Sequence, residues 1–255
     1  MNTLSTTTAV SNGIHISLAA EKLGIFLGIP VTNTLLMSLV VFVILCTIAF
    51  FVRRSLALVP GRVQMLIEVL FTGILDYMTE TLEDKKLARK LFPLILTIFL
   101  FLFTANMIEF TPGVGSAGFF HSSGEFMPLL RSMNTDLNTT LALTLISFVV
   151  IEFMGIATLG ALKYGKKFVN VSSALGFLVG IIELFSELAR LVSFSFRLFG
   201  NIFAGEMMIL VIQYFVPYGI PVPLMAFEVF VGFMQAAIFA LLTLFFVKIA
   251  VTEAH

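Results

Sequence analysis

Residues 193–201 read SFSFRLFGN, and Arg197 in this stretch is the only basic residue between Leu191 and Val247. A guanidinium stays protonated at cellular pH because its pKa exceeds about 12. At the centre of a bilayer such a cation costs from roughly 3 to more than 10 kcal/mol. We therefore expect Arg197 to face water, a carboxylate or both, and we expect function to be organised around it.

The composition predicts a polytopic membrane protein. Hydrophobic residues make up 59% of the 255 residues and charged residues 12%, with a mean hydropathy of +1.07. Such a chain does not fit a water-soluble domain. The formal net charge is 0, so bulk electrostatics do not indicate a nucleic-acid partner. The single cysteine, Cys46, excludes an internal disulfide.

Long apolar runs predict the membrane-crossing helices. A helix needs about 20 residues to cross the hydrocarbon layer, and runs of this kind occupy residues 35–52, 91–108, 137–162, 169–215 and 223–251. The last two exceed one perpendicular crossing and are separated by the proline-rich residues 217–223. We predict an all-α membrane protein with five crossing helices, the last two forming a long, tilted hairpin over residues 169–251.

The charged segment 60–90 predicts an amphipathic helix on the membrane surface. Basic residues cluster in this segment, just before it, and again at residues 163–167, whereas residues 111–136 carry only Arg131. The positive-inside bias then places both basic connections in the cytoplasm. With five crossings, segment 1–30 lies outside and His255 inside, and residues 1–255 form one integral membrane domain.

Polar residues in the last two helices are organised by helical geometry. At 100° per residue, five of them fall within about one third of one helix's circumference: Glu183, Glu187, Arg190, Arg197 and Asn201. Glu206 points to about the opposite side. On the following helix Glu228 and Gln235 are seven residues apart and share a face.

Each of these residues also has a structural interpretation. Glu183, Glu187 and Arg190 have the spacing of a helix-stabilising ion-pair network, and Asn201 suits interhelical hydrogen bonding. Arg197 with Glu206 and Glu228 favours function, because buried carboxylates can exchange protons near neutral pH whereas arginine cannot.

The chain resembles subunit a of bacterial F-type ATP synthases. The resemblance rests first on Arg197–Asn201 (RLFGN) followed by Ala204–Glu206 (AGE), with Gln235 and the ending Thr252–His255. Earlier segments agree with it: Thr32–Thr34, Pro60 with Arg62 and Glu68, Phe92–Asn106, and Thr135–Thr140.

The resemblance implies a stator subunit with two aqueous half-channels that lead to a rotating ring of c subunits. Other implied partners are peripheral-stalk b subunits, the catalytic head indirectly, and lipid, in a bacterial inner membrane. Arg197 would be the essential arginine that faces the ring carboxylates. Glu206 and Glu228 would relay protons in the outer half-channel, and Asn201 and Gln235 would order water near Arg197.

Further half-channel lining is expected from four residues: Glu183, Asp136, Glu152 and Arg190. We expect Glu152, which interrupts an apolar run, to be protonated, paired or in contact with water. Glu109 stands where a small or apolar residue is expected and is interpreted as interfacial. No cofactor or metal is implied, and no Gly-rich, Lys-containing nucleotide loop occurs, so ATP chemistry belongs to partner subunits.

Alternatives remain open. Some family members carry histidine where Glu228 stands, and two relay carboxylates could bind a cation together, so sodium coupling is an alternative. A stand-alone carrier would normally show repeated halves and broken helices, which the sequence does not show. A membrane oxidoreductase is disfavoured because His15, His121 and His255 lie outside the apolar runs. A purely structural subunit would leave Arg197 unexplained.

Overall fold

The computed structural model describes residues 20–26, 28–111, 114, 118–120, 126–165, 167–168 and 174–252. Several expectations fall outside these residues. They concern most of segment 1–30, the three histidines His15, His121 and His255, and the C-terminal Glu253–His255.

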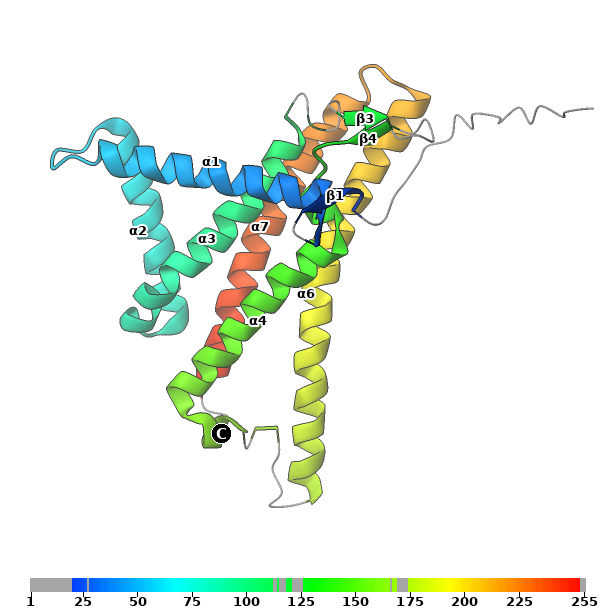
Figure 1. Cartoon of the computed structure of the whole chain (residues 1–255). Coiled ribbons are helices and arrows are strands. Elements are labelled where there is room, and N and C mark those ends of the chain that lie inside the picture. The colour runs from blue at the N-terminus through cyan, green and yellow to red at the C-terminus, as the bar shows by residue number, and fades with distance from the viewer. Residues whose placement is uncertain are drawn as a thin grey trace, which may run out of the picture.

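Long helices dominate the described chain, as the sequence predicted (Figure 1). Four of them are long and apolar enough to cross a membrane: α1 (Asn33–Ser55), α3 (Lys85–Glu109), α4 (Leu137–Leu159) and α7 (Pro221–Val251). A fifth, α6 (Ala174–Phe215), has 42 residues and carries most of the polar residues singled out above. The prediction of a helical membrane protein is confirmed.

A tight turn joins α6 and α7 into the predicted hairpin. Gly219 in this turn has φ +85°, a conformation that residues with a Cβ rarely adopt. Helix α7 begins at Pro221, two residues earlier than the predicted Pro223. Proline is tolerated in the first helical turn because the backbone N–H there has no intrahelical partner.

The charged segment 60–90 is two helices rather than one. Helix α2 (Arg62–Leu82) ends at Glu83, which adopts a left-handed conformation with φ +56°. The next residue, Asp84, caps α3 by accepting hydrogen bonds from the Lys86 and Leu87 N–H groups at 2.7 and 3.3 Å. Residues 85–90 therefore start the following span instead of continuing the surface helix.

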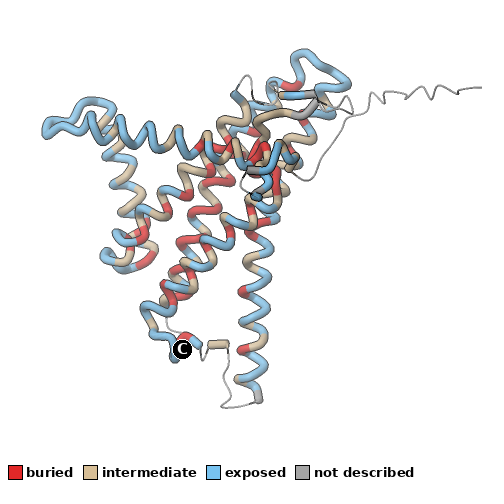
Figure 2. The backbone as a smooth tube through the Cα atoms, in the orientation of Figure 1, coloured by how far each residue is buried: buried red, intermediate tan, exposed pale blue. Residues whose placement is uncertain are grey.

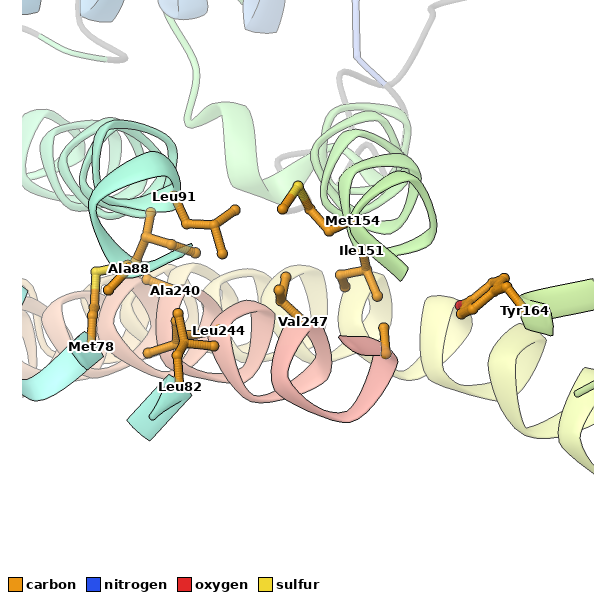
Figure 3. Packing of buried hydrophobic residues seen from close by; sticks show 12 residues of the cluster. Met78, Leu82, Ala88, Leu91, Ile151, Met154, Tyr164, Ala240, Leu244 and Val247 are labelled. Carbon is orange, nitrogen blue, oxygen red and sulfur yellow. The ribbon is translucent and has the colours of Figure 1, made fainter. Parts of the chain in front are cut away.

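The main hydrophobic core lies where α7 meets α2, α3 and α4. Figure 3 shows this packing, with Met78, Leu91, Ile151 and Leu244 each coming from a different helix. Burial is concentrated on α3, α4 and α7, whereas α1, most of α2 and the first half of α6 are largely exposed (Figure 2). A second cluster joins α6 to α3 and α7, and includes Phe194, Leu198, Ile202 and Phe239. It fixes the part of α6 that carries Arg197.

Short elements connect the helices and were not predicted. They are β1 (Lys22–Phe26), β2 (Ile29–Thr32), β3 (Gly118–Phe120), β4 (Phe126–Pro128), the 3₁₀ helix η1 (Met133–Thr135) and α5 (Ala161–Gly165). β1 pairs with β2 and β3 with β4, both antiparallel. Asn33 Nδ2 donates to the Pro128 carbonyl at 3.5 Å, so the start of α1 is tied to β4.

Helix α1 contacts the bundle only near its beginning. Its buried residues are Asn33, Thr34, Met37 and Val41, all in the first nine positions. In Figure 1, α1 runs at a steep angle to α6. The remainder of α1 presents an apolar surface such as Phe51, which is 64% exposed.

Candidate functional site

Arg197 lies on an exposed face of α6. Its Nη2 donates to Ser193 Oγ at 3.5 Å, one turn earlier, and its guanidinium lies 5.8 Å from the Phe194 ring centroid. Within the described part of the chain, Arg197 takes part in no ion pair. The structure thus presents a cation whose charge is not neutralised by an ion pair with any of the described residues.

Gln235 on α7 lies beside Arg197. The two side chains line the same water-sized cavity between α6 and α7, and Gln235 is 8% exposed. Asn201, one turn after Arg197 on α6, is exposed. Of the residues predicted near Arg197, the structure thus brings Gln235 into its cavity and leaves Asn201 on the surface.

Three carboxylates from three helices come together in the C-terminal part of α6. Glu109 on α3 interacts electrostatically with Glu206 on α6 and Glu228 on α7. Glu228 is 5% exposed, and no donor among the described residues reaches the buried Glu206 Oε2. We call Glu109, Glu206 and Glu228 the carboxylate cluster. Glu109, interpreted from sequence as interfacial, is one of its members.

Gly205 allows the Glu228 side chain to approach α6. A Cβ added at Gly205 would overlap the Glu228 carboxyl group, so any other residue would displace it. Because Gly205 directly precedes Glu206, the same short stretch of α6 holds one cluster carboxylate and makes room for another. This accounts for the AG pair in front of Glu206.

The segment before α4 supplies polar groups to the carboxylate cluster. Ser132 Oγ donates to Glu109 Oε2 at 2.7 Å, and the Thr135 side chain lies near the Glu206 carboxyl. Among the described residues, Arg131 is the one cation that acts electrostatically on Glu109 and Glu206.

Buried amides fix the helices around the carboxylate cluster. Asn134 Nδ2 donates to Asn106 Oδ1 at 2.6 Å, and Asn106 Nδ2 donates to the Gly232 carbonyl at 2.8 Å. Asn106 precedes Glu109 by three residues on α3, and Gly232 follows Glu228 by four on α7. The amides thus connect the two helices within one turn of each carboxylate.

A second polar region lies at the start of α6 and is paired. Lys167 Nζ contacts Glu183 Oε1 at 2.8 Å and Glu187 Oε1 at 3.0 Å, and Arg190 Nη1 contacts Glu187 Oε2 at 2.8 Å. We call these four residues the ion-pair network. Burial by itself would lower the pKa of the Lys167 ammonium, but hydrogen bonds with Glu183 and Glu187 outweigh burial and raise it.

Glu152 lies beside the ion-pair network and is held by Tyr164. The Tyr164 hydroxyl donates to Glu152 Oε2 at 3.0 Å, while no described group reaches the buried Oε1. Burial and the neighbouring Glu152 carboxyl raise the pKa of the Tyr164 phenol, which therefore remains a donor. A Cβ at Gly155 would overlap the Tyr164 ring, so α4 is built to admit this side chain.

Asp136 is buried as the N-cap of α4. Its Oδ1 accepts from the Asn138 N–H at 3.0 Å, and its Oδ2 accepts from Thr34 Oγ1 at 3.1 Å. These bonds join α4 to α1 and account for the burial of the carboxylate. Lining of a channel by Asp136 stays a prediction.

The described residues contain no group of three or more His, Cys, Asp or Glu side chains arranged to hold a metal ion. Carboxylate donors are present, but the cluster is not arranged as a coordination shell.

The family assignment comes from comparison with known proteins. A model of the family described as "ATP synthase A chain" matches residues 35–248. The chain belongs to this family. The matched residues include Arg197, the carboxylate cluster and the ion-pair network. The resemblance drawn from RLFGN and AGE is therefore confirmed.

Curated relatives of the family support the same assignment. ATP synthase subunit a of Campylobacter jejuni is 37% identical over 210 residues, which are 82% of this chain and 86% of the relative. Subunit a of Campylobacter fetus is 33% identical over 225 residues, 88% and 92% of the two chains. "ATP synthase subunit a 1" of Syntrophotalea carbinolica is 33% identical over 215 residues, 84% of each.

Family membership and the apolar helices make this protein a multi-pass membrane component of an ATP synthase, active in ion transport and ATP synthesis. Members of this family are subunits of the membrane sector rather than of the catalytic head, and they belong to a complex with other subunits. The individual roles of the polar residues are not given by the family match and are proposed below.

Sequence reasoning missed two contributors to these regions. It treated Glu109 as a departure from the family pattern, although a carboxylate ending an apolar run next to Phe110 was a usable signal. It counted Lys167 only for membrane orientation, whereas the structure makes it the centre of the ion-pair network.

Proposed function

We propose that this chain is the ion-translocating stator subunit of an F-type ATP synthase and couples proton flow to rotation of a ring of c subunits. The observation that carries the proposal is Arg197, an exposed cation on α6 without an ion-pair partner in the described chain. A carboxylate on a passing ring subunit would supply the missing partner. Its negative charge would balance the positive charge that Arg197 presents on the exposed face of α6.

The order of polar groups along α6 supports two half-channels. Arg197 follows Arg190 of the ion-pair network by about 10 Å and precedes Glu206 by about 14 Å, at 1.5 Å per residue. Glu206, Glu228 and Glu109 line the outer half-channel in this proposal. Glu183, with Glu152 and Arg190 nearby, lines the inner one. Arg197 lies between them.

Elementary electrostatics explains how this arrangement couples flow to rotation. The fixed cation favours the ionised form of a ring carboxylate, so the ring site releases its proton as it reaches Arg197. The same charge repels a proton that would pass directly between the half-channels. Protons must then travel with the ring, and each charge moved through 100 mV contributes about 2.3 kcal/mol. This chain holds no catalytic role in ATP chemistry.

The proposal includes five crossings by α1, α3, α4, α6 and α7, with the N-terminus outside and the C-terminus in the cytoplasm of a bacterial inner membrane. The steep angle between α1 and α6 in Figure 1 supports a strongly tilted hairpin if α1 stands across the bilayer. Peripheral-stalk b subunits and lipid contact the remaining exposed surface, and the catalytic head is reached indirectly.

Proton coupling is favoured over sodium coupling. A buried carboxylate can bind and release a proton near neutral pH, as the relay requires. Sodium coupling of the same subunit is the second candidate because the Glu228 carboxyl lies against Gly205, the neighbour of Glu206. A stand-alone carrier is disfavoured because Arg197 has no ion-pair partner among the described residues.

ATP-driven proton pumping and passive proton leak in membrane vesicles test the proposal. Arg197→Ala should abolish coupled pumping while the complex stays assembled. Arg62→Ala removes an exposed cation from α2 and serves as the matched control, which should pump normally. Normal pumping by Arg197→Ala in an assembled complex would overturn the assignment. Replacing Na⁺ by K⁺ throughout separates the two ions, since only sodium coupling would lose transport.

A further inference from the structure

Two water-sized cavities lie on either side of one phenylalanine of α6. The first, between α6 and α7, is lined by Arg197 and Gln235. The second, between α4 and α6, is lined by Arg190, Thr144 and Ser147. Phe194 lines both cavities.

Polar groups make both cavities suitable for water. Ser147 is 2% exposed, and its Oγ has no hydrogen-bond partner among the described residues. The first cavity is bordered by the Arg197 guanidinium and the Gln235 amide, both with unused donors or acceptors in the described chain. A buried space of this size takes a water where two or more polar groups can bind it.

Aromatic rings fill the space between the two guanidinium groups. The Arg190 guanidinium lies 4.2 Å from the Phe246 ring centroid, and the Phe246 and Phe194 centroids are 5.3 Å apart. The Arg197 guanidinium lies on the other side, 5.8 Å from Phe194. Phe239 packs edge-on against Phe194 with centroids 5.1 Å apart. Phe194 and Phe239 are 5% and 4% exposed, so neither ring is displaced easily.

We infer that Phe194, Phe239 and Phe246 form an apolar barrier that keeps water and protons from passing inside this chain between the Arg190 cavity and the Arg197 cavity. We call these three rings the aromatic barrier. The inference rests on the proposed function, because a leak matters only if protons reach both cavities. Hydrophobic constrictions stop conduction by excluding water.

The barrier adds a second form of insulation to that supplied by the Arg197 charge. Arg197 is exposed and opposes proton movement along the surface that would face the ring. The aromatic barrier lies beside Arg197 on the neighbouring, buried side of α6, where a water chain would bypass the ring altogether. Loss of the barrier therefore gives a passive leak while the cation is still present.

Passive proton conductance of vesicles with the whole assembled complex, measured without ATP, tests the inference. Phe194→Leu keeps the space apolar and should leak within about twofold of the parent. Phe194→Ala should leak more, and Phe194→Ser most, at least about fivefold above the parent, because its hydroxyl also holds water. Phe153→Ala on α4, at a site 61% exposed, is the control and should not leak.

Equal conductance of the parent and assembled Phe194→Ser would overturn the barrier. Arg197→Ala in the same vesicles separates this failure from that of the proposed function. If Arg197→Ala loses pumping and the passive proton conductance of Phe194→Ser equals that of the parent, only the barrier is wrong. If Arg197→Ala pumps normally, the proposed function is wrong. Should Phe194→Ser not assemble, Phe246→Ala opens the same barrier from α7, with the same expected leak and the same overturning result.

Discussion

The ion-pair network and the carboxylate cluster lie on the same helix and use the same acidic residue type. In the ion-pair network, Lys167 contacts Glu183 and Glu187, and Arg190 contacts Glu187, all at 2.8–3.0 Å. In the carboxylate cluster, Glu206 shares its surroundings with two further carboxylates and one arginine, and its Oε2 has no donor in the described chain.

In the proposed function, this difference separates glutamates that serve structure from glutamates that exchange protons. A carboxylate with two cationic partners contributes mainly to structure. Buried carboxylates near one another cannot all be charged at low cost, so in the proposed function protons bind to the group and move among its members. The position of a glutamate on its helix does not show whether it belongs to an ion pair or to a group of carboxylates. Its neighbours from other segments decide this.

Of changes in these two regions, the largest effect on pumping is expected when an ionisable oxygen is removed from the carboxylate cluster. Glu206→Gln keeps the size and polarity of the side chain but cannot release a proton. ATP-driven pumping should fall at least about tenfold in assembled vesicles. Glu183→Gln in the ion-pair network is the comparison and should lower pumping less. Equal losses in the two variants would mean that the two regions do not differ as described.

A smaller loss is expected when a cluster carboxylate is displaced rather than removed. Gly205→Ala places a methyl group where the Glu228 carboxyl lies, so Glu228 must move. Pumping should fall several-fold, by about 1 kcal/mol of transition-state stabilisation. Gly73→Ala on α2 meets no atom within 4 Å and serves as the control. Full activity of Gly205→Ala would show that the precise place of Glu228 is unimportant.

The ion-pair network should affect stability more than pumping. Glu187→Gln leaves Lys167 with Glu183 alone and removes the carboxylate that Arg190 contacts, and breaking a buried pair costs about 3 kcal/mol. The temperature at which the purified complex loses its helical circular dichroism should fall. Because the pKa of Lys167 is raised, this stabilisation is present below its usual pKa near 10.4 and is lost as pH rises through the higher, folded value. An unchanged melting temperature would contradict the structural role.

The smallest effect is expected at an exposed pair. Lys248 Nζ donates to Glu83 Oε1 at 2.9 Å, and this hydrogen bond lowers the pKa of Glu83. The contribution to stability is therefore present above the usual pKa of glutamate and is lost as pH falls through the lower, folded value. Glu83→Gln should shift the melting temperature of the complex only slightly, and salt should remove the shift. A large, salt-independent shift would contradict this.

The helices could be predicted from the sequence because a membrane-crossing helix needs a long apolar run, and because prolines mark where a helix begins or is interrupted. The run 35–52 lies within α1, and the prolines before α7 mark its turn. The RLFGN and AGE motifs identified Arg197 and Glu206 without any structure. Helix ends were less accurate: α4 ends at Gly160, whose φ of +85° stops the helix before the predicted residue 162.

The partners of each charge could not be predicted from the sequence. Whether Glu187 is paired depends on Lys167, which lies 20 residues earlier in a connection without helical periodicity. Glu109 joins the carboxylate cluster only because α3 ends next to α6 and α7, a result of helix packing. The spacing of Glu183, Glu187 and Arg190 was consistent with both pairing and transport, and only the distances favour pairing.

Attachment of α1 at one end makes the protein tolerant of changes in bilayer thickness. The 23 residues of α1 span about 35 Å, slightly more than the roughly 30 Å hydrocarbon layer. Only the first half of α1, as far as Val41 and Leu45, packs against the other helices, so we expect α1 to tilt about that end when the membrane thins or thickens. The packed helices α3, α4 and α7 need not follow, and the spacing of the carboxylates is thereby protected from hydrophobic mismatch.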